Sequence, residues 1–329
     1  MKKLNEFEII NKYFAPLTYK EQGAYNLKDD VAVLPIFEKG NWVITTDSLV
    51  ADVHFFQNDP ADLIARKMLR VNLSDLASKG AQPLYYLMTL ALPHSIQESW
   101  IADFAEGLAQ DQEQYNVSLI GGDTVATHGP ITLSVTALGL HNGYMIPRRD
   151  KAKIDDLIVV SGTVGDSALG LMILKKKLIY SLDKQDKDYL VNKYKLPQPQ
   201  IELGLIMSAD NLCSSCLDIS DGFIADLNHL CQQSNVGAVI YEKLLPVSQA
   251  AQFVLKENPS LLMTMLSGGD DYELLFTISK EKYDLFLKQI KNKNISLTIV
   301  GKITNDRTIS IIDQNGKMLP YHKMGYQHF

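Results

Sequence analysis

Short acidic clusters lie at the edges of the apolar segments at five places, and they constrain the fold of this chain more than any other feature. They are Lys28-Asp29-Asp30, Thr45-Thr46-Asp47-Ser48, Gly121-Gly122-Asp123-Thr124, Asp218-Ile219-Ser220-Asp221-Gly222 and Gly268-Gly269-Asp270-Asp271-Tyr272-Glu273. Carboxylates at the ends of buried strands repel one another unless a cation lies among them. Mg²⁺ takes oxygen ligands, usually carboxylates, and substrate phosphates complete its shell. The pattern therefore indicates metal-assisted phosphate chemistry.

Size and charge limit the possible classes of protein. A chain of 329 residues with 46% hydrophobic and 21% charged residues is typical of a globular protein of about two domains. A net charge of −6 argues against nucleic acid or an anionic membrane as a partner. No apolar run is long enough to span a membrane, and residues 1–6 do not resemble an export signal. With three cysteines, we expect a cytoplasmic protein with reduced thiols.

Apolar periodicity predicts an alternation of helices and strands. The predicted helices are 7–14, 60–79, 95–115, 222–233, 250–256 and 280–291, with another after the turn 162–167; the predicted strands are 31–37, 41–46, 84–92, 117–120, 131–140, 156–161, 216–219, 238–241, 273–278 and 296–303. Ser95 with Glu98 has the spacing of a capping box, residues 121–124 are expected to form a turn, and the charged segment 175–199 is partly a surface connection. The expected fold is α/β (α+β), with domains at 1–147 and 148–329.

Asp75 is the most informative single residue. It continues the apolar stripe of Ile64, Met68 and Val71 on the helix predicted from Pro60, so it falls on the buried face. A buried carboxylate without a partner is costly. Asp75 is therefore either a metal ligand or an acid that caps the helix or pairs with a neighbour such as Lys79.

The other clusters each allow two interpretations. Asp47 suits a cation site or the N-cap of a following turn. Gly121 and Gly122 allow close approach to a phosphate, but a Gly-Gly-Asp sequence is also common in hairpin turns. Ser220 and Asp221 suit the N-cap of the next helix, and an anion or a metal could lie at the same helix end.

Several familiar sites are missing or weakly supported. Gly162-Thr163-Val164-Gly165 lacks the continuation of a Walker A motif, and the protein-kinase signatures are absent. Cys213, Cys216 and Cys231 are expected to be buried small apolar residues, so that together with His229 they do not form a zinc site. His54 follows a strand, where a lone histidine is more often a satisfied loop residue than a ligand.

The order of these motifs resembles the thiamine-monophosphate kinase family over nearly the whole chain. The segments that carry the resemblance are 28–34, Thr45 to Val50, His54-Phe55, Val71 to Ala77, Leu119 to Thr124, Gly162 to Gly170, Leu217 to Gly222, Gly268 to Leu274 and 325–329. The resemblance implies the two-domain fold shared with aminoimidazole ribonucleotide synthetase. It also implies a homodimer formed by paired N-terminal sheets, and ATP-dependent phosphorylation of thiamine phosphate to thiamine diphosphate.

The resemblance also implies roles for individual residues. The Mg²⁺ ligands would be Asp30, Thr45, Thr46, Asp47, Asp75, Asp123, Asp218 and Asp221, with Asp47, Asp75 and Asp123 central to catalysis. The nucleotide contacts would be Tyr115, Gly122, Asp123, Arg149 and Ser220, and the contacts to thiamine phosphate would be His54, Asp270 and Tyr326. Several Mg²⁺ ions would hold the two phosphates in line, and an ionised phosphate oxygen needs no strong general base.

The chain departs from the family pattern at three positions. Lys28 stands where the family often has Gly, Asp270 where it usually has Glu, and Gln200 where it usually has Arg. Two alternatives remain from the sequence: another ATP-dependent enzyme of the same fold, such as a selenophosphate synthetase, and a non-catalytic nucleotide-binding regulator. The first Cys at 213 and the final Phe329 disfavour the cysteine-dependent members of this fold.

Overall fold

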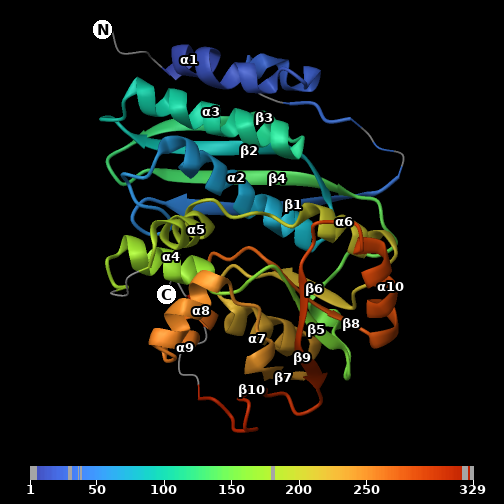
Figure 1. Ribbon diagram of the computed structural model, residues 1–329. Helices are drawn as coiled ribbons and strands as arrows, with labels where there is room; N and C mark the ends of the chain where they lie inside the picture. Colours follow the sequence, from blue (N-terminus) through green and yellow to red (C-terminus); the bar gives the residue numbers. More distant parts are fainter. Residues whose placement is uncertain are drawn as a thin grey trace. The chain divides into compact units, whose positions relative to one another are not determined.

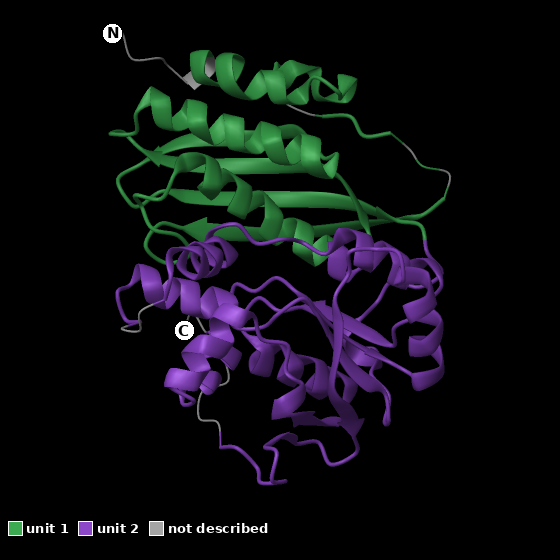
Figure 2. Ribbon diagram, viewed as in Figure 1, with its two compact units in different colours: residues 1–76, 81–142 green, residues 77–80, 143–329 purple. Residues whose placement is uncertain are grey.

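The computed structural model describes residues 6–28, 32–35, 37, 39–178, 182–320 and 325–326. Figure 2 shows two compact units: unit 1 comprises residues 1–76 and 81–142, and unit 2 comprises residues 77–80 and 143–329. The predicted domain boundary after residue 147 stays a prediction. Asp30 lies outside the described residues, so its predicted role as a metal ligand has no structural counterpart.

Unit 1 is built on a four-stranded sheet in the order β1-β4-β2-β3. The strands are β1 (Asn41–Val50), β2 (Gln82–Pro93), β3 (Ser118–Thr127) and β4 (Thr132–His141), and only β2 and β3 are parallel. Helices α2 (Ala61–Ser78) and α3 (Glu98–Tyr115) lie across one face of this sheet (Figure 1). The predicted apolar stripe of α2 is confirmed, since Ile64, Met68 and Val71 are buried.

The N-terminal segment forms short helical turns. They are α1 (Glu6–Ile9), a π-helical turn (Ile10–Phe14) and two 3₁₀ turns (Ala15–Thr18 and Gln22–Leu27). The predicted strand 31–37 is wrong for its described part, because residues 32–35 and 37 belong to no strand. Ala24 in the last turn instead packs with Tyr85, Ile120 and Leu138, and Ala32 and Leu34 lie against the same cluster.

Two local predictions in unit 1 are wrong. Helix α3 begins at Glu98, and the Glu98 carboxylate accepts hydrogen bonds from Lys12 (2.5 Å) and Tyr13 (2.6 Å) instead of forming a capping box with Ser95. Residues 121–124 lie inside β3 rather than in a turn. Gly122 is required there because a Cβ atom would stand 2.0 Å from the Met88 carbonyl oxygen on β2.

Unit 2 contains a six-stranded sheet in the order β10-β7-β9-β5-β8-β6. The strands are β5 (Leu157–Ser161), β6 (Ser215–Asp218), β7 (Gly237–Tyr241), β8 (Leu274–Ile278), β9 (Leu297–Thr304) and β10 (Ile309–Ile312); β7 and β10 are parallel and the other pairs are antiparallel. The α/β (α+β) class predicted from the sequence is confirmed.

Helices cover both faces of the second sheet. The helices of unit 2 are α4 (Asp166–Leu174), α5 (Lys184–Lys195), α6 (Ile201–Ala209), α7 (Phe223–Ser234), α8 (Gln249–Glu257), α9 (Leu261–Leu266) and α10 (Lys280–Ile290), of which α4, α5, α8 and α9 contribute to a further apolar cluster. Alternating side chains face opposite sides: Ile158 packs in the cluster that contains the apolar residues of α7, and Val159 in the cluster that contains those of α6 and α10. The segment 175–199, predicted to be partly a surface connection, contains α5.

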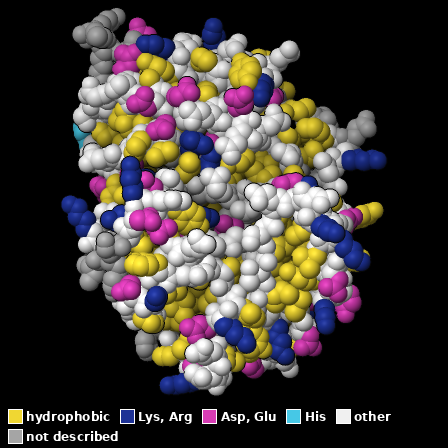
Figure 3. Space-filling view, in the orientation of Figure 1, with side chains coloured by type: hydrophobic (Ala, Val, Ile, Leu, Met, Phe, Trp, Pro, Cys, Tyr) yellow, Lys and Arg dark blue, Asp and Glu magenta, His cyan; other side chains and the backbone are white. Residues whose placement is uncertain are grey.

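The surface and helix composition add two observations. On the face shown in Figure 3, Lys and Arg side chains are interspersed with Asp and Glu rather than gathered in one basic patch. Among the residues that the structure describes, no helix combines the length and the apolar character needed to cross a membrane.

Candidate functional site

The first group of site residues lies where β1 meets α2 in unit 1. The Thr45 hydroxyl donates a hydrogen bond to the Asp75 carboxylate, with an O···O distance of 2.5 Å. Asp75 is half-buried on α2, and Asp47 follows two residues after Thr45, on the same face of the sheet. Two carboxylates and a hydroxyl therefore lie near one another at this edge of the sheet.

Strand register separates the other predicted metal ligands of unit 1 from this group. Thr46 points to the opposite face, where its hydroxyl donates to the Val135 carbonyl and accepts from Thr136. Asp123 on β3 is paired with Thr89 on β2. Its side chain lies on the same face of the sheet as that of Thr46, one row of side chains further along the strands. Since β4 and β2 lie between β1 and β3, the backbones of Asp47 and Asp123 are roughly 14 Å apart.

A pocket opens beside Asp123 in unit 1. It has a volume of about 330 Å³ and is lined by both β3 and the N-terminal turns. Gly121, Gly122, Asp123 and Thr124 form its polar part, and apolar side chains such as Phe14 form the remainder. The segment predicted to approach a phosphate therefore borders a cavity that has both polar and apolar lining residues.

Tyr115 and His54 are both fixed by neighbours within unit 1. The Tyr115 ring lies 5.2 Å from the Arg70 guanidinium carbon, and burial raises the pKa of its hydroxyl to about 12. Arg70 is itself buried and bonded to Asp111. The Nδ1 atom of His54 accepts the Val50 N–H at 3.0 Å, which leaves Nε2 as the protonated ring nitrogen of the neutral form.

In unit 2 the structure brings three distant motifs together. The Asp270 N–H donates to the Ser220 carbonyl (2.9 Å), and the Tyr326 N–H donates to the Asp221 carbonyl (3.0 Å). Gly269 lies so close to this loop that a Cβ atom would stand 2.3 Å from the Ser220 oxygen. Backbone hydrogen bonds therefore hold Asp270 and Tyr326 next to Ser220 and Asp221, and we call these four residues the frame. The predicted contact of His54, Asp270 and Tyr326 with thiamine phosphate stays a prediction.

Asp226, which sequence reasoning missed, holds this frame in place. Its carboxylate accepts the N–H groups of Ser220, Asp221 and Gly222 at 3.0 to 3.1 Å. Burial, together with the charges of Asp218 and Asp221, raises the pKa of Asp226 to about 8. Ser220 and Asp221 do not provide the predicted N-cap of α7, because Gly222 occupies that position and Asp226 binds these amides from within the helix.

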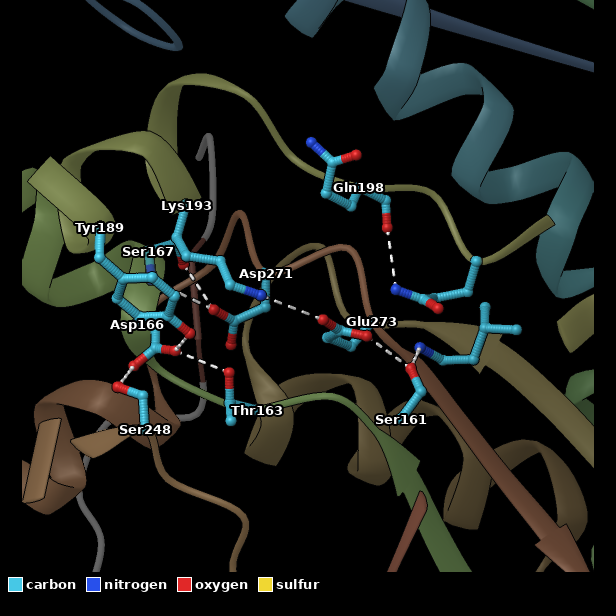
Figure 4. A network of polar contacts seen from close by, with 12 residues as sticks. Ser161, Thr163, Asp166, Ser167, Tyr189, Lys193, Gln198, Ser248, Asp271 and Glu273 are labelled. Carbon is cyan, nitrogen blue, oxygen red and sulfur yellow. Dashed lines mark hydrogen bonds and ion pairs between the residues drawn. The ribbon is translucent and has the colours of Figure 1, made fainter. Parts of the chain in front are cut away.

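A polar network lies next to the same frame, around the turn before α4 (Figure 4). Asp166 accepts hydrogen bonds from the hydroxyls of Thr163 (2.6 Å), Tyr189 (2.9 Å) and Ser248 (2.6 Å). Its carboxylate thereby connects the turn with α5 and with the residue before α8. All four residues belong to unit 2, and three elements are fixed relative to one another.

Asp271 and Glu273 complete this network. Asp271 bonds to the N–H of Gly165 (2.7 Å) and to Ser167, and burial raises its pKa to about 7. Glu273 accepts from Ser161 (2.6 Å) and pairs with Lys193 at 3.4 Å. Burial raises the pKa of Glu273 despite Lys193, whereas Glu273 raises the pKa of Lys193 against the effect of burial.

The remaining predicted residues have simple surroundings. The Arg149 side chain is exposed, while its carbonyl accepts from Ser215 and Ser234. Gln200 precedes α6 and donates to the Gln198 carbonyl. The three cysteines are free and buried, with Cys213 and Cys216 in the core cluster on the α6 side of the sheet and Cys231 in the one on the α7 side. Their predicted lack of a metal stays a prediction.

The donor atoms suit an Mg²⁺ ion that is bound partly by the protein and partly by substrate phosphates and water. Among the described residues, no three His, Cys, Asp or Glu side chains form a group that could hold a metal ion. Mg²⁺ is commonly held by one or two carboxylates together with substrate phosphates and water. The Asp47 and Asp75 carboxylates with the Thr45 hydroxyl in unit 1, and the Asp218 and Asp221 carboxylates in unit 2, offer donor sets of that size.

Comparison with known families covers most of the chain. Residues 28–141 match the family described as AIR synthase related protein, N-terminal domain, and residues 153–314 match the family described as its C-terminal domain. The chain is 38% identical over 329 residues to the thiamine-monophosphate kinase of Escherichia coli, covering 98% of each protein. It is 36% identical over 330 residues to that of Buchnera aphidicola, covering 99% of each.

Solved structures give the same result. The thiamine-monophosphate kinase of Stenotrophomonas maltophilia superposes with a TM-score of 0.79 at 35% identity, covering 89% of this chain and 91% of that one. AaThiL complexed with AMPPCP and TMP superposes with a TM-score of 0.77 at 28% identity, covering 100% and 99%. Similarity to these proteins therefore extends through both units.

Proposed function

This chain belongs to the thiamine-monophosphate kinase family, and we propose from that premise how its residues perform the reaction. The protein is a kinase that transfers the γ-phosphoryl group of ATP to thiamine phosphate and forms thiamine diphosphate. Full-length similarity to kinases favours this function over another enzyme of the same fold or a non-catalytic regulator.

The observation that carries the proposal is the frame in unit 2. Ser220 and Asp221 hold the backbones of Asp270 and Tyr326 by hydrogen bonds of 2.9 and 3.0 Å, although Tyr326 is more than a hundred residues away in sequence. In our proposal Asp270 and Tyr326 contact thiamine phosphate. The Tyr326 ring, which is 41% exposed, offers a flat apolar surface to an aromatic ring of the vitamin, and His54 of unit 1 is the third contact.

Mg²⁺ is the proposed cofactor. Asp47, Asp75 and Thr45 would hold it in unit 1, and Asp218 and Asp221 in unit 2; Thr46, Asp123 and Asp30 remain proposed ligands on family resemblance. Mg²⁺ supplies charge neutralisation between the two phosphate groups. The chain itself supplies oxygen donors held by hydrogen bonds, such as Asp75 by Thr45. No side-chain base is proposed, because a phosphate oxygen of the acceptor is already ionised.

The proposed nucleotide contacts are carried over from the family resemblance. Gly122 and Asp123 line the pocket of about 330 Å³ in unit 1. The apolar lining residues of this pocket, such as Phe14, suit a nucleobase. The other proposed contacts are Tyr115, Arg149 and Ser220. The Arg149 side chain is exposed, and its guanidinium group suits binding to a phosphate group.

We also propose a cytoplasmic homodimer. The open face of the unit 1 sheet carries Ile44 and Val125, which are 62% and 44% exposed. Apolar side chains on one sheet face are suited to pairing with the same face of a second copy. The buried, free cysteines are consistent with a reducing compartment.

One assay tests the proposed reaction. The purified protein is incubated with ATP, Mg²⁺ and thiamine phosphate, and thiamine diphosphate is measured by chromatography. We expect product from thiamine phosphate and little from free thiamine, because the site would lack the anion that its metals bind. Equal or faster turnover of free thiamine would overturn the assignment.

A further inference from the structure

The Ser167 hydroxyl lies between two oxygen atoms at hydrogen-bonding distance, one of which, Oδ1 of Asp271, also accepts the Ser167 N–H at 3.3 Å. Its Oγ is 2.6 Å from the carbonyl oxygen of Gly269 and 2.7 Å from Oδ1 of Asp271. A serine hydroxyl carries one proton, and a backbone carbonyl carries none. Ser167 can therefore donate fully to only one of these two atoms, although both distances are those of full O–H···O hydrogen bonds.

A second proton on Asp271 resolves this geometry. We propose that Asp271 is kept as a neutral carboxylic acid and positions the Gly269–Asp270 turn through a relay in which Asp271 donates to Ser167 and Ser167 donates to the Gly269 carbonyl. Oδ2 of Asp271 remains an acceptor, and the Gly165 N–H donates to it at 2.7 Å. Every polar atom in this relay then has a partner.

The surroundings of Asp271 favour the neutral form. The side chain is buried, and its pKa is raised to about 7, mainly by burial. The charged groups that face it are the Asp166 carboxylate from α4 and the Lys193 ammonium from α5, with Glu273 and Asp270 on its own segment. Lys193 forms an ion pair with Glu273 at 3.4 Å, which offsets much of its charge at Asp271. Helix α9 has no ionisable side chain.

The relay acts on the segment that we assign to the acceptor, so this inference rests on the proposed function. Loss of the Asp271 proton to solvent would leave a carboxylate, which takes the Ser167 proton as a stronger, charge-assisted bond. The Gly269 carbonyl would then lose its donor. Asp270 follows directly in the chain with a φ of +71°, a conformation that depends on its neighbours to hold it. Asp271 is thus a positioning residue for Asp270.

Infrared spectroscopy tests the protonation without any substrate. The wild-type protein should show the C=O stretch of a buried carboxylic acid at about pH 5 and lose it at about pH 9. The Asp271→Asn spectrum should lack one component of this difference, while the components from Asp226 and Glu273, whose pKa values are also raised, remain. Asp103→Asn, which replaces an exposed acid on α3, should retain all of them. Identical spectra for the wild type and Asp271→Asn would overturn the proposal.

Kinetics test the positioning role independently. The Asp271→Asn amide can donate to the Ser167 hydroxyl and accept from Gly165, so it keeps these two hydrogen bonds of the neutral acid at every pH, although its NH2 group cannot accept the Ser167 N–H. In the wild type we expect the KM for thiamine phosphate to rise at least threefold on the alkaline side, while the KM for ATP is unaffected. Asp271→Asn should lack this rise. Ser167→Ala should show the raised KM at all pH values.

The outcomes separate the two proposals. An Asp271→Asn variant whose KM for thiamine phosphate is raised at every pH would show that the carboxylate, not the acid, is needed, and would overturn the relay. A protein that forms no thiamine diphosphate would overturn the proposed function, and the infrared comparison would still decide the protonation of Asp271.

Discussion

The Thr45 hydroxyl on β1 is hydrogen-bonded to the Asp75 carboxylate on α2 at 2.5 Å, although the two residues are 30 positions apart. This bond orients a half-buried acid toward the edge of the sheet where Asp47 also lies. Ligating carboxylates are commonly fixed by such partners, whose loss lowers metal affinity or activity. The pair therefore connects the packing of unit 1 with its proposed metal site.

The first prediction concerns this pair. Thr45→Val removes the hydroxyl but keeps the side-chain shape, and we expect kcat to fall about 10- to 100-fold. Asp75→Asn should lower kcat by at least about 100-fold, because it removes a charge that holds the cation. Both variants are assayed over a range of Mg²⁺ concentrations. Thr45→Ser keeps the hydroxyl and serves as the matched control; normal Mg²⁺ dependence in Thr45→Val would contradict the proposed site.

The second prediction concerns acceptor recognition. Asp270→Ala and Tyr326→Ala should raise the KM for thiamine phosphate more than the KM for ATP, because a contact made equally before and during the reaction affects binding rather than kcat. Asp270→Glu should be tolerated, although the φ of +71° at this position favours Asp or Asn among residues other than glycine. Steady-state kinetics with each substrate varied in turn provides the measurement. Weakened binding of ATP alone would place both residues on the nucleotide side.

Much of the fold follows from local sequence. Helix α2 was predicted from the apolar stripe between Pro60 and Gly80, and it forms over Ala61–Ser78. Pro60 at its start, Gly80 after its end and its apolar periodicity all favour the same helix, so the local sequence preference and the tertiary packing agree. The turn predicted at Gly121-Gly122 was wrong because a tertiary contact, not the local sequence, decides the structure there. Two glycines usually indicate a turn, but here β3 passes so close to Met88 that only glycine fits. That approach depends on a strand more than thirty residues away.

The site was predictable only where its signal was local. The clusters that contain Asp218, Asp221 and Asp270 could be recognised from their own neighbourhoods. Asp226 could not, because from sequence it is a single acid in an amphipathic helix, and its role is to bind three N–H groups of the preceding loop. Likewise, the partners of Asp271 lie more than a hundred residues away, at Gly165 and Ser167.

The third prediction concerns assembly. Ile44 is 62% exposed on the open face of the unit 1 sheet, and Ile44→Glu would place a charge in the proposed dimer interface. We expect light scattering after size-exclusion chromatography to report a dimer for the wild type and a monomer for this variant. Ile154→Glu, at a position 50% exposed in unit 2, is the matched control and should remain dimeric. A wild-type monomer at all concentrations would refute the proposed homodimer.

The fourth prediction concerns the dependence of stability on pH. The folded-state pKa of Asp271, about 7, lies above its unfolded value of about 3.9, so the folded protein binds this proton more tightly. Between about pH 4 and about pH 7 the free energy of unfolding should therefore fall as pH rises, by up to about 1.4 kcal/mol per pH unit from this group, and then level off.

Asp271→Asn isolates this contribution, since the asparagine side chain does not titrate. Asp226 and Glu273 also have raised pKa values, and Asp306 and Asp313 have lowered ones, but these groups are common to both proteins and cancel in the comparison. The difference in unfolding free energy between the variant and the wild type should rise in favour of the variant by roughly 4 kcal/mol from about pH 4 to about pH 7. Urea denaturation across this range measures it. A difference that does not change with pH would mean that Asp271 ionises in the folded protein as it does in the unfolded chain.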